Sequence, residues 1–396
     1  MDRILLKNGR VLCPETGIDD TLDIIIMGGR IASIRKDADI ESEGQSGEVD
    51  WSVIDCKSKL VLPGLIDLHV HLREPGEEYK ETVLSGASAA VAGGFTTVAC
   101  MANTNPVNDN EGITKQIIEK AAAAGKARVL PIGAVTKGLK GAELSEMGEL
   151  KQAGCVGFSD DGKPIKDGAI MRSALEYALA LDGAPVISHA EDPCIVGSGV
   201  MNESATSTRL GLAGIPNAAE DAMVARDIAL SEASHGRLHI AHVSTRGAVE
   251  LIRAAKKRGV NVTAEATPHH LFLSDTVVKG YDTDAKMNPP LRSDEDIKAL
   301  RKALKDGTID CIATDHAPHS SIEKDVEFDC AAFGVVGLET ALALTLKLVD
   351  EKVLTLNEAI SRLTRDPARI FNIAGGSLKL GGTADITIVD LKKKWT

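Results

Sequence analysis

The sequence lacks the patterns that mark several large classes of protein. It contains no uninterrupted apolar run long enough to cross a bilayer and no signal-peptide pattern at its start, so we expect no membrane segment and no export. Its seven cysteines are scattered without a CxxC pair, which is typical of reduced thiols and argues against disulfides or a thiolate zinc site. The formal charge of −12 argues against nucleic-acid or anionic-membrane partners. We therefore predict a cytoplasmic protein.

Short β-rich runs separated by turn signals occupy the beginning of the chain. Turn pairs accompany these runs at Asn8-Gly9 and Gly28-Gly29, and a similar run lies near the far end of the sequence. We predict a small β-sandwich-like domain built from residues 1–60 and 376–396. The polar segment 39–50 is expected to be an exposed loop.

The middle of the chain alternates short apolar runs with alanine-rich helical stretches, which is the pattern of βα units and a parallel sheet. It contains neither a GxGxxG after the first strand nor a Walker-type phosphate loop, so a nucleotide-binding fold has no support. Eight consecutive units favour an α/β fold, a (β/α)8 TIM barrel over residues 61–375, rather than an open doubly wound sheet. After the last strand, further helices are predicted over Val335–Val349 and Asn357–Arg365. The predicted strands are Leu65–His71, Thr96–Met101, Arg128–Gly133, Val156–Ser159, Pro185–His189, Leu238–Val243, Asn261–Ala264 and Ile309–Thr314.

Two histidines lie on the first of these strands. Alternate side chains of a strand point the same way, so His69 and His71 are expected to project together. Imidazoles are the commonest protein ligands for zinc-like ions, and an aligned pair supplies half of a pre-organised site. The alternative is that both are structural residues at a strand end, and the other strand ends decide between the two interpretations.

Histidines and aspartates recur at the ends of other predicted strands, on the side of a barrel where active sites are built. Strand four is followed by Asp160 and Asp161, strand five by His189, strand six by His242 and strand eight by Asp315. Each residue alone has a structural explanation, such as a helix N-cap for the aspartates. Their joint occurrence predicts a metal site.

Four histidines and two carboxylates are more than one tetrahedral ion needs, and they suit two ions that share a bridging carboxylate. Two divalent ions would lower the pKa of a water molecule and polarise a carbonyl oxygen. Asp315 could then serve as both a ligand and a proton shuttle to a leaving nitrogen.

Four longer strings narrow the interpretation. They are DLHVHLREPG at 67–76, MANTNP at 101–106, NPPLR at 288–292 and ATDHAPH at 313–319. Together they resemble the class I dihydroorotases of the amidohydrolase superfamily, and the similarity extends over nearly the whole chain.

The resemblance implies a role for each strand-end residue. His69 and His71 match ligands of a first zinc ion, and Asp315 matches its further ligand and the general acid and base. His189 and His242 match ligands of a second zinc ion.

The bridging ligand differs among relatives. In hydantoinases a carbamylated lysine at the end of strand four bridges the two ions, whereas this chain has Asp160 and Asp161 at that place. The family pattern, aligned through the following Gly162, favours Asp161 as the bridge. Asp160 is the alternative.

The resemblance also implies which residues bind the substrate, which carries a carboxylate beside a cyclic amide. Arg73, Asn103 and His319 match the positions that bind the carboxylate, and an arginine fork suits that group. His71 would also face the substrate. The ring contacts fall on Asn288 and on the main chain of Phe333 and Gly334.

Two further features lie near the predicted site. His269 and His270 follow strand seven, but the family pattern does not make them ligands. We expect both to be structural residues or to support the ligands from behind. The charged segment 320–329 is expected to be either a lid over the substrate or an ordinary exposed connection.

The resemblance implies a zinc-dependent dihydroorotase that interconverts N-carbamoyl-L-aspartate and L-dihydroorotate in pyrimidine biosynthesis. It further implies a homodimer that can form a complex with aspartate transcarbamoylase. Two alternatives remain: another cyclic amidohydrolase such as a hydantoinase or allantoinase, and a non-catalytic dihydroorotase-like partner of the transcarbamoylase.

Overall fold

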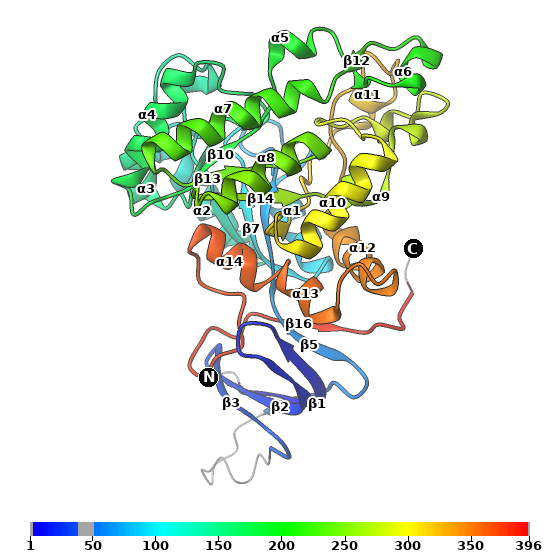
Figure 1. The fold of residues 1–396 in the computed structure, drawn as a ribbon. Coiled ribbons are helices and arrows are strands. Elements are labelled where there is room, and N and C mark those ends of the chain that lie inside the picture. Colours follow the sequence, from blue (N-terminus) through cyan, green and yellow to red (C-terminus); the bar gives the residue numbers. More distant parts are fainter. Residues whose placement is uncertain (1–2, 39–50, 395–396) are drawn as a thin grey trace.

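The computed structural model describes residues 3–38 and 51–394, with a sheet at one end and a larger body of strands and helices at the other (Figure 1). The loop predicted at 39–50 lies outside the described residues. No helix within the described residues is long and apolar enough to cross a membrane.

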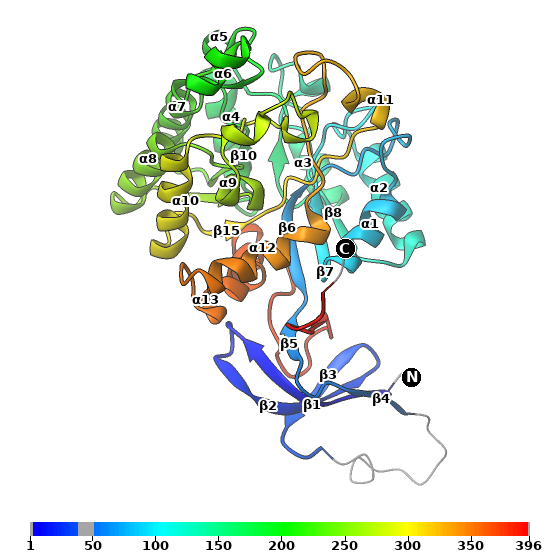
Figure 2. The same cartoon turned by 90° about the vertical axis from the view of Figure 1, so that its right-hand side faces the viewer.

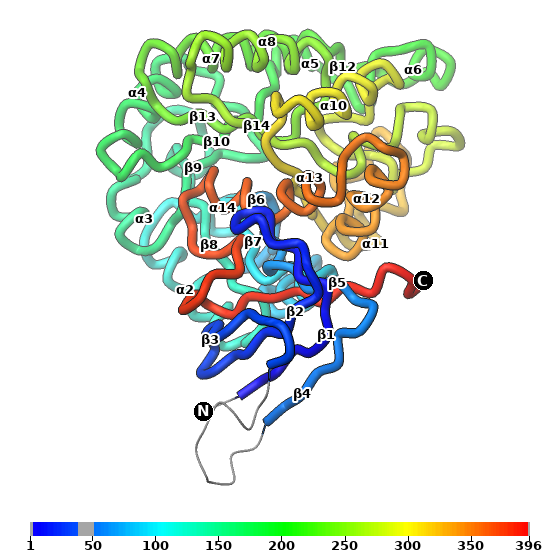
Figure 3. Tube along the Cα trace, turned by 60° about the horizontal axis from the view of Figure 1, so that its bottom comes forward, coloured from blue at the N-terminus to red at the C-terminus, as the bar shows by residue number. Residues whose placement is uncertain are grey.

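Strands from both ends of the sequence form one six-stranded sheet, in the order β16-β5-β1-β2-β3 with β4 pairing β1. Strand β16 runs antiparallel to β5, with Ile388 opposite Val61, and Figure 3 shows the C-terminal segment beside the N-terminal strands. Apolar side chains of these strands bury a small core of their own. The strands are β1 (Arg3–Cys13), β2 (Ile18–Met27), β3 (Arg30–Arg35), β4 (Trp51–Asp55), β5 (Leu60–Pro63) and β16 (Ile386–Val389).

The turn signal at Asn8-Gly9 does not end a strand. Strand β1 continues through it, and its pairing with β2 shifts register between Leu6 and Gly9. Asn8 has a φ of 62°, a left-handed conformation that asparagine tolerates better than most residues. The pair therefore makes a bulge where the sequence indicates a turn, whereas Gly28-Gly29 does join β2 to β3.

Eight parallel strands build the larger body, and each lies within a few residues of its predicted position. They pair in two groups, β6-β7-β8 and β15-β14-β13-β10-β9. Two isolated parallel bridges join the groups at both edges, one from Gly133 to Phe158 and one from Val70 to His316, so the pairing returns to the first strand. The strands are β6 (Leu65–Val70), β7 (Phe95–Cys100), β8 (Arg128–Pro131), β9 (Phe158–Ser159), β10 (Val186–Ser188), β13 (Leu238–Ile240), β14 (Val262–Ala266) and β15 (Cys311–Ile312).

Helices cover the outside of this eight-stranded sheet (Figure 2), and their apolar faces share its main core. The longer helices are α1 (Val83–Ala92), α2 (Glu111–Ala124), α4 (Gly168–Leu179), α7 (Ala218–Ser234), α8 (Arg246–Lys257), α10 (Asp294–Asp306) and α12 (Leu338–Asp350). Shorter elements between them are α3 (Met147–Ala153), α5 (Pro193–Val196), α6 (Ala205–Leu210), α9 (Pro268–Phe272), α11 (Ser321–Lys324) and the strand pair β11 (Met201–Asn202) and β12 (Gly214–Ile215).

The single helix predicted over Asn357–Arg365 is wrong. The structure has two short helices instead, α13 (Leu356–Ser361) and α14 (Arg365–Phe371). Thr364, between them, has a φ of −133° and a ψ of −84°, which are not helical. Pro367 lies three residues after Thr364, in the first turn of α14, and proline is tolerated only in the first turn of a helix because it lacks an amide hydrogen.

Apolar side chains close one end of the eight-stranded sheet. Ile66, Leu68, Ile132 and Ile187 cluster there with Phe371 of α14. Each such side chain contributes roughly 1.5–3 kcal/mol of burial energy, so this floor is a stable support. The polar residues that follow the carboxyl ends of the strands lie at the other end.

Candidate active site

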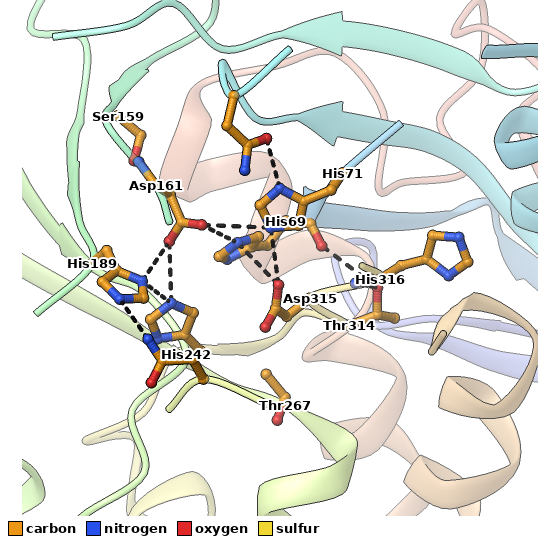
Figure 4. A network of polar contacts seen from close by, with 12 residues as sticks. His69, His71, Ser159, Asp161, His189, His242, Thr267, Thr314, Asp315 and His316 are labelled. Atoms are coloured by element: carbon orange, nitrogen blue, oxygen red, sulfur yellow. Dashed lines mark hydrogen bonds and ion pairs between the residues drawn. The ribbon is translucent and has the colours of Figure 1, made fainter. Parts of the chain in front are cut away.

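Six buried histidines and aspartates gather at the carboxyl ends of the parallel strands (Figure 4). Each comes from the end of a strand or from the residues that follow it directly. They are His69 of β6 and His71 just beyond it, Asp161 after β9, His189 after β10, His242 after β13 and Asp315 after β15.

The Asp161 carboxylate lies between two pairs of histidines. Its Oδ1 is 3.1 Å from both Nδ1 of His189 and Nε2 of His242. Its Oδ2 is 3.4 Å from Nε2 of His69 and of His71. One carboxylate therefore faces two separate sets of ring nitrogens, as Figure 4 shows.

Asp315 completes one of these sets. Its Oδ1 is 3.1 Å from Nε2 of His71 and 3.4 Å from Nε2 of His69. Asp67 fixes the two chain segments concerned, because its Oδ1 accepts from the main-chain amides of His69 (3.1 Å) and Thr314 (3.0 Å). Burial raises the pKa of Asp67 to about 6, against the effect of these hydrogen bonds.

The donor set fits divalent metal ions. Nε2 of His69 is fully buried and forms no hydrogen bond with the described residues, only the 3.4 Å contacts with Asp161 and Asp315. Nδ1 of His189 lies only 2.9 Å from Nε2 of His242. Imidazole nitrogens and carboxylate oxygens converging on two adjacent points are what zinc ions take as ligands. Burial opposes a charge on His189, but Asp161 and Glu191 outweigh it and raise the pKa of His189 to about 10. The carboxylates of Asp161 and Glu191 thus favour a positive charge beside them.

The neighbouring Asp160 serves a different purpose. Its Oδ1 accepts from the main-chain amides of Val135 (2.8 Å) and Thr136 (2.9 Å), and its Oδ2 from the Thr136 hydroxyl. These bonds hold the chain that follows β8. Of the two adjacent aspartates, only Asp161 contacts the histidines.

A cavity of about 250 Å³ opens beside the metal-ligand candidates. It brings together every residue that the sequence analysis assigned to the substrate, together with Asp161, His189 and Asp315. Those substrate residues are His71, Arg73, Asn103, Asn288, His319, Phe333 and Gly334. Leu139, Gly162, Lys163 and Ala317 also line the cavity and were not anticipated.

Arg73 presents an unpaired positive charge to this cavity. Its guanidinium is buried, and its Nε donates to the Pro318 carbonyl at 3.1 Å. Its Nη2 lies 3.3 Å from Nε2 of His319, but that nitrogen makes a shorter contact of 2.7 Å with the Phe333 carbonyl and donates there. None of the described residues forms an ion pair with Arg73, and burial lowers its pKa. A buried charge of this kind calls for an anionic ligand.

Two other lining residues carry buried polar atoms that form no hydrogen bond with the described residues, although buried polar atoms are nearly always hydrogen-bonded. They are Oδ1 of Asn288 and Nδ1 of His319, and the latter lies 3.7 Å from Oε2 of Glu323. The Asn288 amide nitrogen donates to Glu191 at 3.2 Å, which leaves the oxygen directed elsewhere. Asn103 accepts from Nδ1 of His71 at 2.9 Å, so Nε2 of His71 presents its lone pair to the aspartates.

His269 and His270 lie outside the group of six. His270 has both ring nitrogens occupied, by the Thr267 hydroxyl at 2.8 Å and the Pro289 carbonyl at 3.0 Å. Burial lowers the pKa of His269 to about 4, so its ring is neutral near pH 7.

Comparison with known proteins decides the family. A family model described as dihydro-orotase-like matches residues 58–248. The dihydroorotase of Syntrophotalea carbinolica is 56% identical over 394 residues, covering 100% of this chain and 91% of that protein. The dihydroorotase of Trichlorobacter lovleyi is 54% identical over 99% of this chain and 91% of its own length. The chain belongs to the dihydroorotase family.

Solved structures of cyclic amidohydrolases share the fold of this dihydroorotase-family chain. The L-hydantoinase of Arthrobacter aurescens matches with a TM-score of 0.82 and 25% identity, over 98% of this chain and 86% of its own. The D-hydantoinase of Thermus sp. matches with a TM-score of 0.80 and 24% identity, over 98% and 87% of the two chains. Members of the family are metal-dependent enzymes that open or close cyclic amides. This chain has candidate metal-binding groups in His69, His71 and Asp315 and in His69, Asp161 and His242.

One residue that supports the dihydroorotase site was missed from the sequence. Oε1 of Glu265 is 2.6 Å from Nδ1 of His69, and its Oε2 is 3.1 Å from Nε2 of His239. Burial opposes its charge, but His69 and His239 lower the pKa of Glu265 to about 2. A lone glutamate within a buried apolar strand is a signal for such a residue. The predicted strand stopped at Ala264, whereas β14 continues through Glu265 to Ala266.

Three residues of the site have left-handed backbones. The φ angles are 60° for Arg73, 32° for His242 and 50° for Asp315. Such conformations are unfavourable for residues with a Cβ and persist where the surrounding structure imposes them. They turn these side chains towards the common centre just beyond the strand ends.

Proposed function

We propose that the chain is a class I dihydroorotase, which interconverts N-carbamoyl-L-aspartate and L-dihydroorotate on a (β/α)8 barrel. The observation that carries this proposal is the buried, unpaired guanidinium of Arg73, which faces the same cavity as the histidines and aspartates. A cyclic amide with a carboxylate on its ring would place the carboxylate at Arg73 and the amide beside the histidines and aspartates. The curated relatives at 54–56% identity support the same activity.

Two zinc ions are the proposed cofactors. His69, His71 and Asp315 would hold one, His189 and His242 the other, and Asp161 would lie between them. The contacts of Asp161 with both sets of histidines support its role as the bridge. When bound, zinc supplies a lowered water pKa and a polarised carbonyl group.

The protein would orient the substrate by binding two of the substrate's groups, the carboxylate and the ring amide. The Arg73 guanidinium would bind the carboxylate, assisted by the side chains of Asn103 and His319. Oδ1 of Asn288 has no partner and would accept from a ring N–H. The main chain of Phe333 and Gly334 would contact the opposite side of the ring amide.

Asp315 would move the proton. Burial opposes its charge, but His69 and His71 hold the pKa of Asp315 well below its usual value, so the group is an ionised carboxylate. In the hydrolytic direction water adds to the ring carbonyl carbon, and Asp315 takes its proton. As the carbon–nitrogen bond breaks, the same carboxyl group passes the proton to the departing nitrogen. Ring closure reverses these steps.

An activity panel tests the proposal against a hydantoinase or allantoinase function. The purified zinc-loaded protein is assayed with L-dihydroorotate, hydantoin and allantoin. We expect turnover of dihydroorotate to exceed that of the other two, because neither of them carries the ring carboxylate that Arg73 would bind. Faster turnover of hydantoin or allantoin would overturn the proposal.

A non-catalytic role is disfavoured because none of the expected ligands is missing from the sequence. The contacts of Asp161 with His189, His242, His69 and His71, and of Asp315 with His71, support the same view. Metal analysis combined with the dihydroorotate assay tests this. A protein that binds no metal and shows no turnover after zinc addition would support a scaffold role.

We further propose a homodimer that works in the cytoplasm and can associate with aspartate transcarbamoylase. The seven unpaired cysteines support a reducing compartment. Light scattering of the purified protein, with and without the transcarbamoylase, measures both assemblies.

A further inference from the structure

The ammonium group of Lys324, the last residue of α11, donates three hydrogen bonds to main-chain carbonyl oxygens. It donates to Gly334 at 2.8 Å, Ala332 at 3.0 Å and Lys286 at 3.2 Å. An ammonium group has three N–H bonds, so this set occupies all of them. Burial lowers the pKa of Lys324, and no described residue forms an ion pair with it.

A second lysine extends these connections. Nζ of Lys286 is buried, donates to the carbonyls of Phe328 (2.7 Å) and Asp329 (3.0 Å), and lies 4.4 Å from the centre of the Phe333 ring. The Lys286 carbonyl also accepts from the Gly334 amide at 3.0 Å. The two lysines therefore join the segment 328–334 to the chain just before the lining residue Asn288.

These bonds orient the main chain of residues 332–334, which forms one wall of the cavity through Phe333 and Gly334. The carbonyls of Ala332 and Gly334 turn to Lys324, while the Phe333 carbonyl between them accepts from His319 at 2.7 Å. Gly334 has a φ of 142°, and a Cβ there would come within 2.6 Å of the Ala317 carbonyl. The wall thus packs directly on the chain that leads to His319.

We propose that Lys324 is a positioning residue for the substrate, holding residues 332–334 where Phe333 and Gly334 meet the ring amide. This inference rests on the proposed dihydroorotase function. It also gives the segment 320–329, which the sequence leaves as either a lid or an ordinary exposed connection, a supporting role behind residues 332–334.

Other contacts also anchor the segment 320–329. Glu323 pairs with Lys80 at 3.0 Å and caps the start of α11 through Ser320. The Phe328 side chain is buried.

The test is Lys324→Met in the zinc-loaded enzyme, measured by steady-state kinetics with L-dihydroorotate. We expect KM to rise by about tenfold or more while kcat stays within about threefold, because the site for the ring is displaced and the proton-transferring group is not. The zinc content should equal that of the unmodified enzyme. Lys302→Met, at an exposed position of α10, is the matched control and should change neither constant.

A chemical rescue separates positioning from general damage. Lys324→Cys is alkylated with 2-bromoethylamine, which restores an ammonium group on a side chain of nearly lysine length, and KM should return towards its original value. The unmodified enzyme receives the same treatment, since Cys194 and Cys330 are also exposed. If Lys324→Met does not fold, Lys324→Gln, which keeps one amide donor, is expected to show a smaller rise in KM.

An unchanged KM in these variants, a fall in kcat alone, a loss of zinc, or failure of alkylation to restore KM would each overturn the inference. Absence of dihydroorotate turnover in the unmodified, zinc-loaded enzyme would instead refute the proposed function.

Discussion

Replacing Arg73 with methionine should remove the contact with the substrate carboxylate and leave the metal ligands in place. Arg73 is only 8% exposed and forms no ion pair with the described residues, so the substrate would supply its counter-charge. Truncating one member of a buried, hydrogen-bonded charge pair costs about 2–5 kcal/mol. At about 1.36 kcal/mol per tenfold change, kcat/KM for L-dihydroorotate should fall by roughly 30- to 5000-fold.

The assay compares two rings that differ only in the carboxylate. L-dihydroorotate and 5,6-dihydrouracil are followed by loss of the ring-amide absorbance in the zinc-loaded enzyme. Because dihydrouracil has no carboxylate, Arg73→Met should change its kcat/KM little, and the preference between the two substrates should collapse. Arg172→Met, at an exposed position of α4, is the matched control and should preserve the preference.

A specific pattern would refute this reasoning. If Arg73→Met lost activity equally on both rings while keeping its zinc and its melting temperature, Arg73 would not recognise the carboxylate.

Three further predictions concern the metal ligands and the surrounding carboxylates and histidines. Asp161→Asn should lower bound zinc from about two ions per chain to one or none by mass-spectrometric metal analysis, whereas Asp160→Asn should keep its zinc and lose thermal stability. Glu265→Gln should weaken zinc retention against a chelator about 10- to 100-fold, because the charged contact that orients the His69 ring is lost. Unchanged retention would contradict this. Burial and the charge of Arg73 lower the pKa of His319 to about 4, below its unfolded value near 6.5. The unfolded chain therefore binds more protons between these values, and stability present above pH 6.5 should be lost as the pH falls towards 4. Urea midpoints of the wild type should fall across this range more steeply than those of His319→Asn.

Much of the architecture can be predicted from local pattern. The eight parallel strands are short apolar runs at regular spacing, and the polar residues that matter follow their ends directly. The pairing of His69 with His71 is a partial success of this logic. Simple alternation predicts that both point the same way, but β6 has a register shift between Asp67 and Val70, so their convergence also depends on an irregular strand end.

Contacts between distant segments could not be predicted. Lys324 reaches the Lys286 carbonyl 38 residues away, and no local pattern links a surface-like charged loop to that oxygen. Whether His319 accepts a hydrogen bond from Arg73 depends on which group receives the N–H of His319, and only the folded geometry fixes that. The sequence favours Asp161 over Asp160 only through the family pattern, whereas the hydrogen bonds of Thr136 to Asp160 appear only in the folded structure.

The pairing of β5 with β16 has a consequence for synthesis on the ribosome. More than 300 residues separate Pro63 from Ile386, so the partner of β5 emerges long after β5 itself. At 5–20 residues per second, the interval is roughly 15 to 65 s. All residues of the proposed active site emerge before β16. During this interval one edge of the apolar strand β5 has no partner strand. An open apolar edge invites pairing with other chains, so the nascent protein is most exposed to aggregation at its first-made sheet rather than at its catalytic end.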